Sequence, residues 1–165
     1  MKRPDPAAAI AAVLAAQREE NQPQTLFRAL DAALAAAIGN ILFTILVHHP
    51  AARESERFYS NRPAEYPLGG RKPVTDSPWM RQVIGRGEPY IGRNAADICE
   101  VFFDHALIHS LGCESVLNMP VRWRNRTLGT LNLLHRAGYY EESDLPVVRL
   151  FAGLTLPGLM ILSTD

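Results

Sequence analysis

The stretch from Gly112 to His135 (GCESVLNMPVRWRNRTLGTLNLLH) constrains the fold of this chain more than any other. It contains two apolar runs, Ser115–Val121 and Thr127–Leu134, separated by a short cluster of charged and polar residues. Apolar runs of about seven residues that are bounded by turn-forming residues are typical of strands rather than helices. We therefore predict a β-hairpin at the centre of a sheet.

The length of the hairpin loop decides which side chains share a face, because a register shift of one residue moves every side chain to the opposite face. A two-residue loop would place Asn118 and Asn132 on opposite faces of the sheet. A three-residue loop over residues 124–126, with Asn125 or Arg126 in the left-handed conformation, pairs the two asparagines instead. We favour the three-residue loop because it separates the polar side chains from the aliphatic ones.

With this register the hairpin has two chemically different faces. One face carries no polar side chain and is suited to pack against helices: Leu117, Met119, Val121, Gly129, Leu131 and Leu133. The other combines two amides and a hydroxyl with apolar groups, as the wall of a small-molecule pocket does: Val116, Asn118, Pro120, Thr130, Asn132 and Leu134. The alternative is that the two asparagines hydrogen-bond to each other and to a neighbouring loop, without a ligand.

The rest of the chain alternates helical and extended patterns. An alanine-rich helix is expected from Asp5-Pro6 to Glu20, and a second helix to about Ile38. Strands are expected over Ile41–His49, Glu56–Asn61 and Glu88–Gly92, and a loop rich in proline and glycine over Arg62–Val74. Further helices are expected from Ser77 to Gly85, from Asp97 to Leu111, and from Ser143 to Pro157-Gly158, where proline should kink or end the helix.

Length and charge restrict the function. A chain of 165 residues predicts one domain, which we place at residues 23–165, after an N-terminal helical extension over residues 1–22. The 17 basic and 17 acidic residues balance, which argues against a nucleic-acid-binding protein. Cys99 and Cys113 do not make a disulfide framework, and no apolar run approaches the roughly 20 residues that span a bilayer. We expect a cytoplasmic protein that binds neither nucleic acid nor a membrane.

The order of elements and the hairpin are similar to those of the GAF family of small-molecule sensor domains. The resemblance covers roughly Thr25 to Leu156 and is carried by Gly112, Ser115, Pro120, the segment Thr127–Leu131 and the apolar helix from Ser143. It implies an α+β fold, in which terminal helices cover one face of a central antiparallel sheet and a ligand pocket lies on the other face. It also implies a homodimer formed through the terminal helices, which would pass its signal to a downstream protein partner.

The chain departs from the specialised members of this family. The asparagine–lysine–phenylalanine–aspartate–glutamate signature of cyclic-nucleotide sensors is not visible, and no cysteine occurs in the context used by bilin photoreceptors. GAF-like free methionine sulfoxide reductases place carboxylates at positions that correspond to Val116, Asn132 and Leu134, none of which is acidic here. Cys113 also lies closer to the strand than the reactive cysteine of those enzymes. A related redox enzyme, or an interaction module with a vestigial pocket, is therefore the alternative to a small-molecule sensor.

The candidate site combines the polar face of the hairpin with the helix that precedes it. His105 and His109 are four residues apart in the expected helix Asp97–Leu111, and imidazole can both donate and accept hydrogen bonds. Together with Cys113 they would also suit a transition metal, but no fourth ligand is apparent, and histidines bonded to the backbone are the structural alternative. We assign no metal ligand, catalytic residue or cofactor. The predicted binding residues for a small organic ligand are Phe102, His105, His109, Val116, Asn118, Thr130, Asn132 and Leu134.

Overall fold

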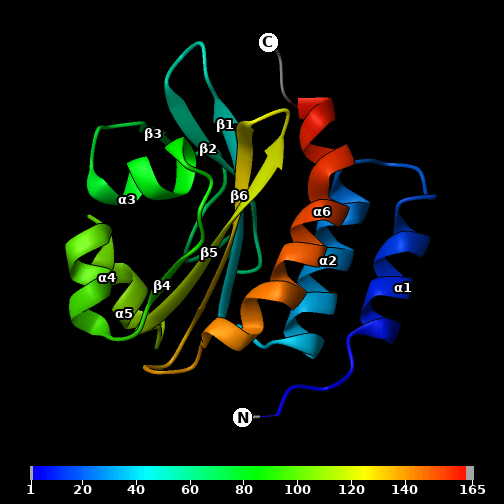
Figure 1. Cartoon of the computed structure of the whole chain (residues 1–165), viewed down its shortest axis with the longest axis horizontal. Coiled ribbons are helices and arrows are strands. Elements are labelled where there is room, and N and C mark those ends of the chain that lie inside the picture. Colours follow the sequence, from blue (N-terminus) through cyan, green and yellow to red (C-terminus); the bar gives the residue numbers. More distant parts are fainter. Residues whose placement is uncertain (1, 163–165) are drawn as a thin grey trace.

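The computed structural model describes residues 2–162 and consists of a six-stranded sheet between two layers of helices (Figure 1). All neighbouring strands are antiparallel, and their order is β3-β2-β1-β6-β5-β4. The strands are β1 (Leu42–His49), β2 (Glu54–Ser60), β3 (Arg71–Pro73), β4 (Tyr90–Gly92), β5 (Ser115–Trp123) and β6 (Arg126–His135). The predicted hairpin is β5–β6, and β6 lies at the centre of the sheet beside β1.

The helices divide between the two faces of the sheet (Figure 1). One face is covered by α1 (Ala7–Ala16), α2 (Gln24–Ala37) and α6 (Leu145–Leu162), which follows the short 3₁₀ turn η2 (Glu142–Asp144). The other carries α3 (Pro78–Met80), the π-helical turn η1 (Arg81–Gly85), α4 (Ala95–Val101) and α5 (His105–Ser110). The predicted α+β architecture, with the terminal helices on one face, is confirmed.

The hairpin has the predicted faces but not the predicted loop. Asn118 pairs with Asn132, and this register runs from Ser115 to Val121. The loop itself has two residues, Arg124 and Asn125, and both have positive φ, at 49° and 61°. A β-bulge at Leu128 supplies the additional residue that we had placed in the loop, so the strand faces are preserved.

The aliphatic face of the hairpin forms the main core. Leu117, Met119, Val121, Leu131 and Leu133 are at most 1% exposed and belong to one apolar cluster with the facing side chains of the terminal helices. From the helices this cluster includes Val13, Leu30, Leu34, Val148 and Phe151. Burial of one such side chain stabilises a fold by roughly 1.5–3 kcal/mol, so this interface holds the helical layer on the sheet.

Three boundaries differ from the sequence-based expectations. The loop Arg62–Val74 contains the edge strand β3, which pairs with Glu54–Glu56 of β2. The helix expected over Asp97–Leu111 is two helices, because the backbone of Phe102 is extended (φ −113°, ψ 122°) and α5 starts only at His105. The last helix continues through Pro157 to Leu162.

Packing explains why Pro157 does not end α6. Thr155 and Leu159, on either side of the proline, are fully buried, and Pro157 itself is exposed. Gly158 lies so close to α2 that a Cβ atom there would be 2.9 Å from Cε1 of Phe27. The contacts on both sides of Pro157 therefore hold the helix together where its own hydrogen bonding is interrupted.

The helical stretch Glu142–Leu162 is longer and more apolar than the sequence-based expectation that no apolar run approaches roughly 20 residues. The stretch has 21 residues, contains an 18-residue segment with a mean hydropathy of 1.8, and is long and apolar enough to cross a membrane by length and composition alone. This is weak evidence, because core helices of soluble proteins pass the same test. Here the stretch packs Val148, Phe151 and Leu159 into the core beneath the sheet.

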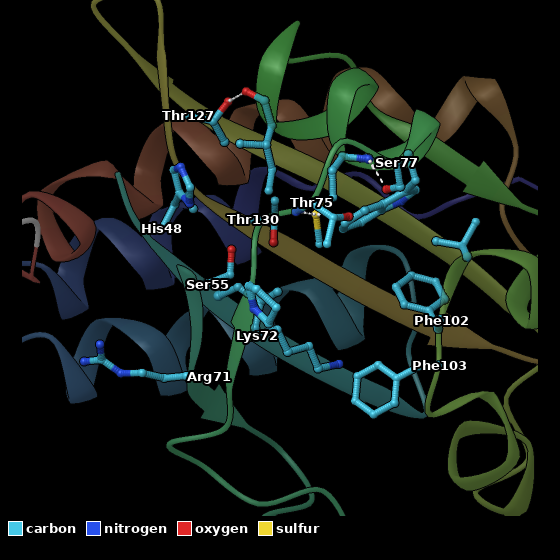
Figure 2. A pocket seen from close by; sticks show the side chains of 17 residues that line it. His48, Ser55, Arg71, Lys72, Thr75, Ser77, Phe102, Phe103, Thr127 and Thr130 are labelled. Carbon is cyan, nitrogen blue, oxygen red and sulfur yellow. Dashed lines mark hydrogen bonds between the residues drawn. The ribbon is translucent and has the colours of Figure 1, made fainter. Parts of the chain in front are cut away.

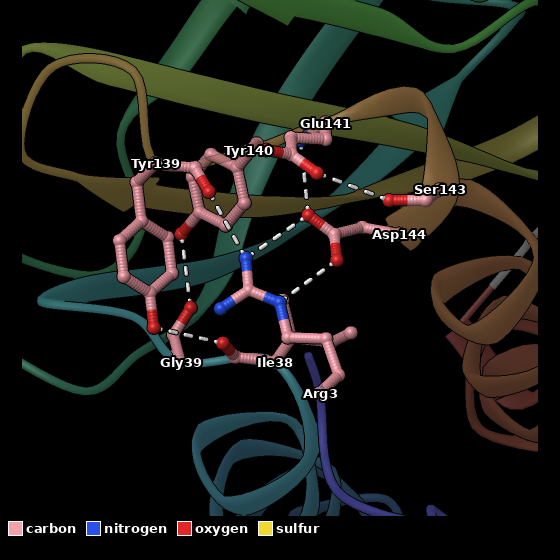
Figure 3. Close-up of polar contacts among 8 residues, drawn as sticks. All are labelled: Arg3, Ile38, Gly39, Tyr139, Tyr140, Glu141, Ser143 and Asp144. Carbon is pink, nitrogen blue, oxygen red and sulfur yellow. Dashed lines mark hydrogen bonds and ion pairs between the residues drawn. The ribbon is translucent and has the colours of Figure 1, made fainter. Parts of the chain in front are cut away.

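The N-terminal segment is attached to the start of α6 by a partly buried ion pair (Figure 3). Arg3 donates from Nε and Nη2 to the two carboxylate oxygens of Asp144, at 2.8 and 3.0 Å, and also to the carbonyl oxygen of Tyr139. Tyr139 and Tyr140 in turn donate to the carbonyl oxygens of Ile38 and Gly39. Residues 2–22 of the expected extension thus pack against the rest of the chain; residue 1 and residues 163–165 lie outside the described residues.

Candidate functional site

A row of polar side chains crosses the sheet on the face opposite the terminal helices. Thr44, Asn132 and Asn118 are neighbours across β1, β6 and β5. Asn132 Nδ2 donates to Thr44 Oγ1 (3.2 Å), and Asn118 Nδ2 donates to Asn132 Oδ1 (2.7 Å). Asn118 Oδ1 accepts a hydrogen bond from Trp79 Nε1 at 3.1 Å. The two amides therefore bond to each other and hold the indole of Trp79 over the sheet.

Next to this row lies a chamber of about 360 Å³, between the sheet and the short helices (Figure 2). Its floor is formed by β1, β2 and β6, and its walls by β3, the segment Thr75–Met80 with Ile84, and the connection from α4 to α5. Ligand pockets in proteins have volumes of about 300–1,000 Å³, so the chamber is large enough for a small organic molecule. The lining residues used below are Leu46, His48, Lys72, Trp79, Phe102 and Thr130.

The chamber continues inward as a narrow extension of about 40 Å³. The two spaces share Leu46, Lys72, Trp79 and Phe102, and the extension reaches the asparagines and the apolar residues beside them. Trp79 and Phe102 pack edge to face above it, with ring centroids 5.5 Å apart. The aromatic pair thus separates the open chamber from the polar row.

Four side chains form a charged cluster at the inner side of the chamber. Asp104 Oδ2 accepts hydrogen bonds from Tyr66 and, at 3.2 Å, from Lys72 Nζ. Arg57, which is 7% exposed, lies 3.9 Å from the same oxygen and stacks on the Tyr66 ring at 3.6 Å. The ammonium of Lys72 also lies 4.4 Å from the centre of the Phe103 ring. One carboxylate is therefore shared by two cations.

Burial shifts the pKa values of three groups here. It lowers the pKa of Lys72, although Asp104 opposes this shift, and it lowers the pKa of the chamber residue His48. Burial and the hydrogen bond to Asp104 raise the pKa of Tyr66 well above its ordinary value, which keeps the phenol protonated. At neutral pH the cluster therefore holds a neutral phenol beside the shared carboxylate.

The structure brings most of the predicted binding residues together, but not the histidines. Phe102, Val116, Asn118, Asn132 and Leu134 line the inner extension, and Thr130 lines the chamber. His105 and His109 instead line a separate hollow of about 280 Å³ with Cys99 and Cys113. The break at Phe102 separates the two histidines from the chamber, because both lie on a new helix, α5, that is not continuous with α4.

The cysteines do not take part in the chamber. Cys99 is exposed, and Cys113 is buried, which raises the pKa of its thiol to about 11. Within residues 2–162, no three histidine, cysteine or acidic side chains come together as a metal site would need. The lining of the chamber combines hydrogen-bond donors such as Lys72 with the aromatic side chains of Trp79 and Phe102.

The sequence analysis missed the charged side of the site. Arg57 and Lys72 were not among the expected residues, because the first lies in a strand with mixed polarity and the second in the expected loop. The available signal was the alternation in Glu54–Ser60, where Ser55 and Arg57 occupy the same face of a strand. Trp79 was also not among the expected residues, and its hydrogen bond to Asn118 was not foreseen.

Comparison with known proteins identifies the fold. No protein-family model and no curated protein sequence matches the chain. Among solved structures, the GAF domain of a phosphoenolpyruvate-protein phosphotransferase from Acinetobacter matches with a TM-score of 0.75 and 12% identity, over 94% of this chain and 93% of that one. This chain has a GAF-like fold.

Other solved GAF domains have the same architecture. The phycoerythrobilin-bound GAF domain of a cyanobacterial phytochrome matches with a TM-score of 0.71 and 15% identity, over 96% of this chain and 95% of that one. The GAF domain of a two-component sensor histidine kinase from Bacillus halodurans matches with a TM-score of 0.67 and 12% identity, over 82% and 92%. These matches cover 82–96% of this chain and 92–95% of the matched chains, and they come from a phosphotransferase, a phytochrome and a sensor histidine kinase.

Proposed function

We propose that this GAF-like domain is a cytoplasmic, homodimeric sensor that binds a small organic molecule in the chamber. The observation that carries the proposal is the chamber itself, with about 360 Å³ of open volume above the sheet. A vestigial pocket would be filled by its own side chains, because protein interiors are close-packed. Here Trp79 is held by Asn118 at the edge of an unfilled space.

The chamber lies close to the helix that would carry the signal. Gly129 of β6 lines the chamber. A Cβ atom placed on Gly129 would lie on the opposite face of the sheet, 2.9 Å from Cδ1 of Leu159 in α6. A ligand that changes the position of β6 would therefore act directly on α6. Such a signal requires the ligand to bind one arrangement of the helices more tightly than the other.

The terminal helices also offer a surface for a second copy of the chain. Leu150, Met160 and Ile161 of α6 are 47–61% exposed, and Leu14 of α1 is 47% exposed. An exposed apolar patch of this kind marks an interaction surface, and a two-fold dimer would bury the same patch on both subunits. The proposed dimer would place the two α6 helices next to each other, where a downstream partner could respond to their arrangement.

Native mass spectrometry of the purified protein tests the proposal, because it measures subunit number and retained molecules together. We expect the mass of two subunits plus a small molecule that is released on denaturation. Leu46→Trp, which fills the chamber from its floor, should abolish retention, and Leu68→Trp on an exposed loop should not. Retention by Leu46→Trp at the wild-type level would contradict binding in this chamber.

A further inference from the structure

The lining of the chamber is one-sided in charge. Within the described chain, the residues that line it include His48, Arg71 and Lys72, and no aspartate or glutamate. Arg71 is 50% exposed and is paired with Glu54 and Glu56, so its charge is balanced outside the chamber. Figure 2 shows Arg71 pointing away from the other lining side chains, whereas Lys72 extends towards Phe103. Lys72 is therefore the cation that a bound molecule would meet.

The cluster behind Lys72 carries more positive than negative charge. Arg57 and Lys72 share the single carboxylate of Asp104, and Tyr66 donates a hydrogen bond to the same carboxylate oxygen. Two cations and one carboxylate leave a formal excess of one positive charge in a largely buried place. An uncompensated buried charge is unfavourable, so the site favours a ligand that supplies one negative charge.

Unused hydrogen-bond groups lie in the same region. Thr130 Oγ1 is buried and has no hydrogen-bond partner. Thr130 lines the chamber, and the residue as a whole is 3% exposed. Arg57 Nε, Asp104 Oδ1 and His48 Nδ1 are also buried without a hydrogen-bond partner; Arg57 lines the inner extension and His48 lines the chamber. Buried polar groups are normally satisfied, and each unsatisfied one costs stability in the absence of a ligand. A carboxylate can accept hydrogen bonds from several donors at once.

The remaining wall is apolar and aromatic. Trp79, Phe102 and Phe103 line it together with Met80 and Ile84. The ligand therefore has to combine an acceptor-rich, negatively charged group with an apolar body that stacks on aromatic rings.

We propose, resting on the proposed function, that the chamber binds an organic monoanion, with a carboxylate near Lys72 and an aromatic or branched apolar body against Trp79 and Phe102. One negative charge matches the excess of one positive charge in the cluster. A phosphate monoester carries about 1.5–2 negative charges at neutral pH, which is more than the one positive charge that the cluster has in excess.

Four probes with similar bodies test this assignment: 3-phenylpropanoate, the neutral 3-phenylpropanamide, the cationic 3-phenylpropylamine and 2-phenylethyl phosphate. Their dissociation constants are measured by NMR titration of ¹⁵N-labelled protein from which retained molecules have been removed. We expect the carboxylate to bind at least about tenfold more tightly than the other three, as a charge-assisted hydrogen bond provides. Equal or tighter binding of the amide, the amine or the phosphate would overturn the assignment.

Two variants locate the anion. Lys72→Met should remove the preference for the carboxylate over the amide, and Lys2→Met, the same substitution at the other lysine of the chain, should keep it. Thr130→Val removes an unpaired buried hydroxyl from the chamber wall, so it should raise the melting temperature of the ligand-free protein. An unchanged preference in Lys72→Met would contradict the placement of the carboxylate.

Failure of this inference can be distinguished from failure of the proposed function. If native mass spectrometry finds a retained neutral or cationic molecule that Leu46→Trp releases, the sensor proposal holds and the monoanion is wrong. If the wild-type protein retains no molecule and binds none of the four probes at millimolar concentration, both proposals are wrong.

Discussion

Asp144 is a single carboxylate on which two parts of the chain depend. It accepts hydrogen bonds from Arg3 and from the backbone amide of Glu141, and so connects the N-terminal segment to the start of α6. Burial raises the pKa of Asp144, but the hydrogen bond and charge of Arg3 and the Glu141 amide outweigh burial, so the pKa is below its ordinary value. A group of this kind stabilises the fold above its unfolded pKa of about 3.9 and loses that contribution as the pH falls through the folded pKa.

We predict that Asp144→Asn lowers the free energy of unfolding at pH 7 by about 1–3 kcal/mol, because the Arg3 guanidinium loses its charged partner. The difference from wild type should shrink as the pH falls below about 4, where the carboxyl group is first protonated in the unfolded chain and, at lower pH, in the folded protein. Urea unfolding at pH 7, 5 and 3 measures this. Asp76→Asn is the control, since Asp76 is 84% exposed and its pairing with Arg81 should contribute little. A difference that stays constant down to pH 3 would contradict the role of the carboxylate.

The two cysteines should differ in reactivity. Thiolates are the reactive species, and burial raises the pKa of Cys113 to about 11, whereas Cys99 is exposed. We predict that iodoacetamide at pH 7.5 modifies Cys99 in the folded protein and Cys113 only after unfolding. Peptide mass spectrometry over a time course measures both rates. Fast modification of Cys113 in the folded protein would revive the alternative of a redox enzyme.

At the scale of the elements, two glycines of α6 make a matched pair. A Cβ atom at Gly158 would meet Phe27 at 2.9 Å and Leu26 at 3.1 Å, whereas one at Gly153 would meet nothing within 4 Å. We predict that Gly158→Ala lowers the free energy of unfolding by about 1–3 kcal/mol through overpacking. Gly153→Ala should raise it by about 0.5–1 kcal/mol, because alanine is the better helix former. Chemical unfolding at a fixed protein concentration compares them, and a stabilised Gly158→Ala would show that α6 can move away from α2.

The hairpin turn gives a second test at this scale. Arg124 and Asn125 both have positive φ, as a two-residue hairpin loop requires, and arginine adopts this conformation with a cost that asparagine largely avoids. We predict that Arg124→Asn raises the free energy of unfolding by about 0.5–1 kcal/mol. The same measurement on Arg136→Asn, outside the hairpin loop, is the control. A loss of stability in Arg124→Asn would indicate that the arginine side chain makes a contact that outweighs the backbone strain.

The sequence predicted faces of elements better than their ends. The alternation of Ser115–Val121 and Thr127–Leu134 was enough to place Asn118 opposite Asn132, because burial of one face fixes the register. It was not enough to identify the loop, since the bulge at Leu128 and a longer loop have the same effect on the rest of the hairpin. The helix break at Phe102 has no glycine or proline to mark it, and β3 is a three-residue strand whose pattern is too short to recognise.

The candidate site shows the same limit. The apolar and amide residues on the hairpin were predictable, since they follow from one periodic pattern. The charged side was not, because Arg57, Lys72 and Asp104 come from three segments that only the fold brings together. His105 and His109 were placed with the asparagines by an assumed continuous helix, and that assumption failed.

For the whole molecule, the proposed dimer depends on the outer face of α6. We predict that Leu150→Asp converts a dimer into a monomer, because it places a charge in the apolar patch. Leu68→Asp is the matched control, since Leu68 is similarly exposed but lies on the loop between β2 and β3. Sedimentation velocity over a range of concentrations measures both. A dimer that persists in Leu150→Asp would exclude this face as the interface.

The two outer strands of the sheet have a consequence for how copies of this protein meet. β3 and β4 have three residues each, and Pro73 in β3 lacks a backbone donor. A foreign strand that docked at either border would find few free amide and carbonyl groups to bond with, so growth of a continuous intermolecular sheet is disfavoured. Concentrated folded protein should therefore resist fibrillar assembly, which favours the proposed association through the helices on the other side of the sheet.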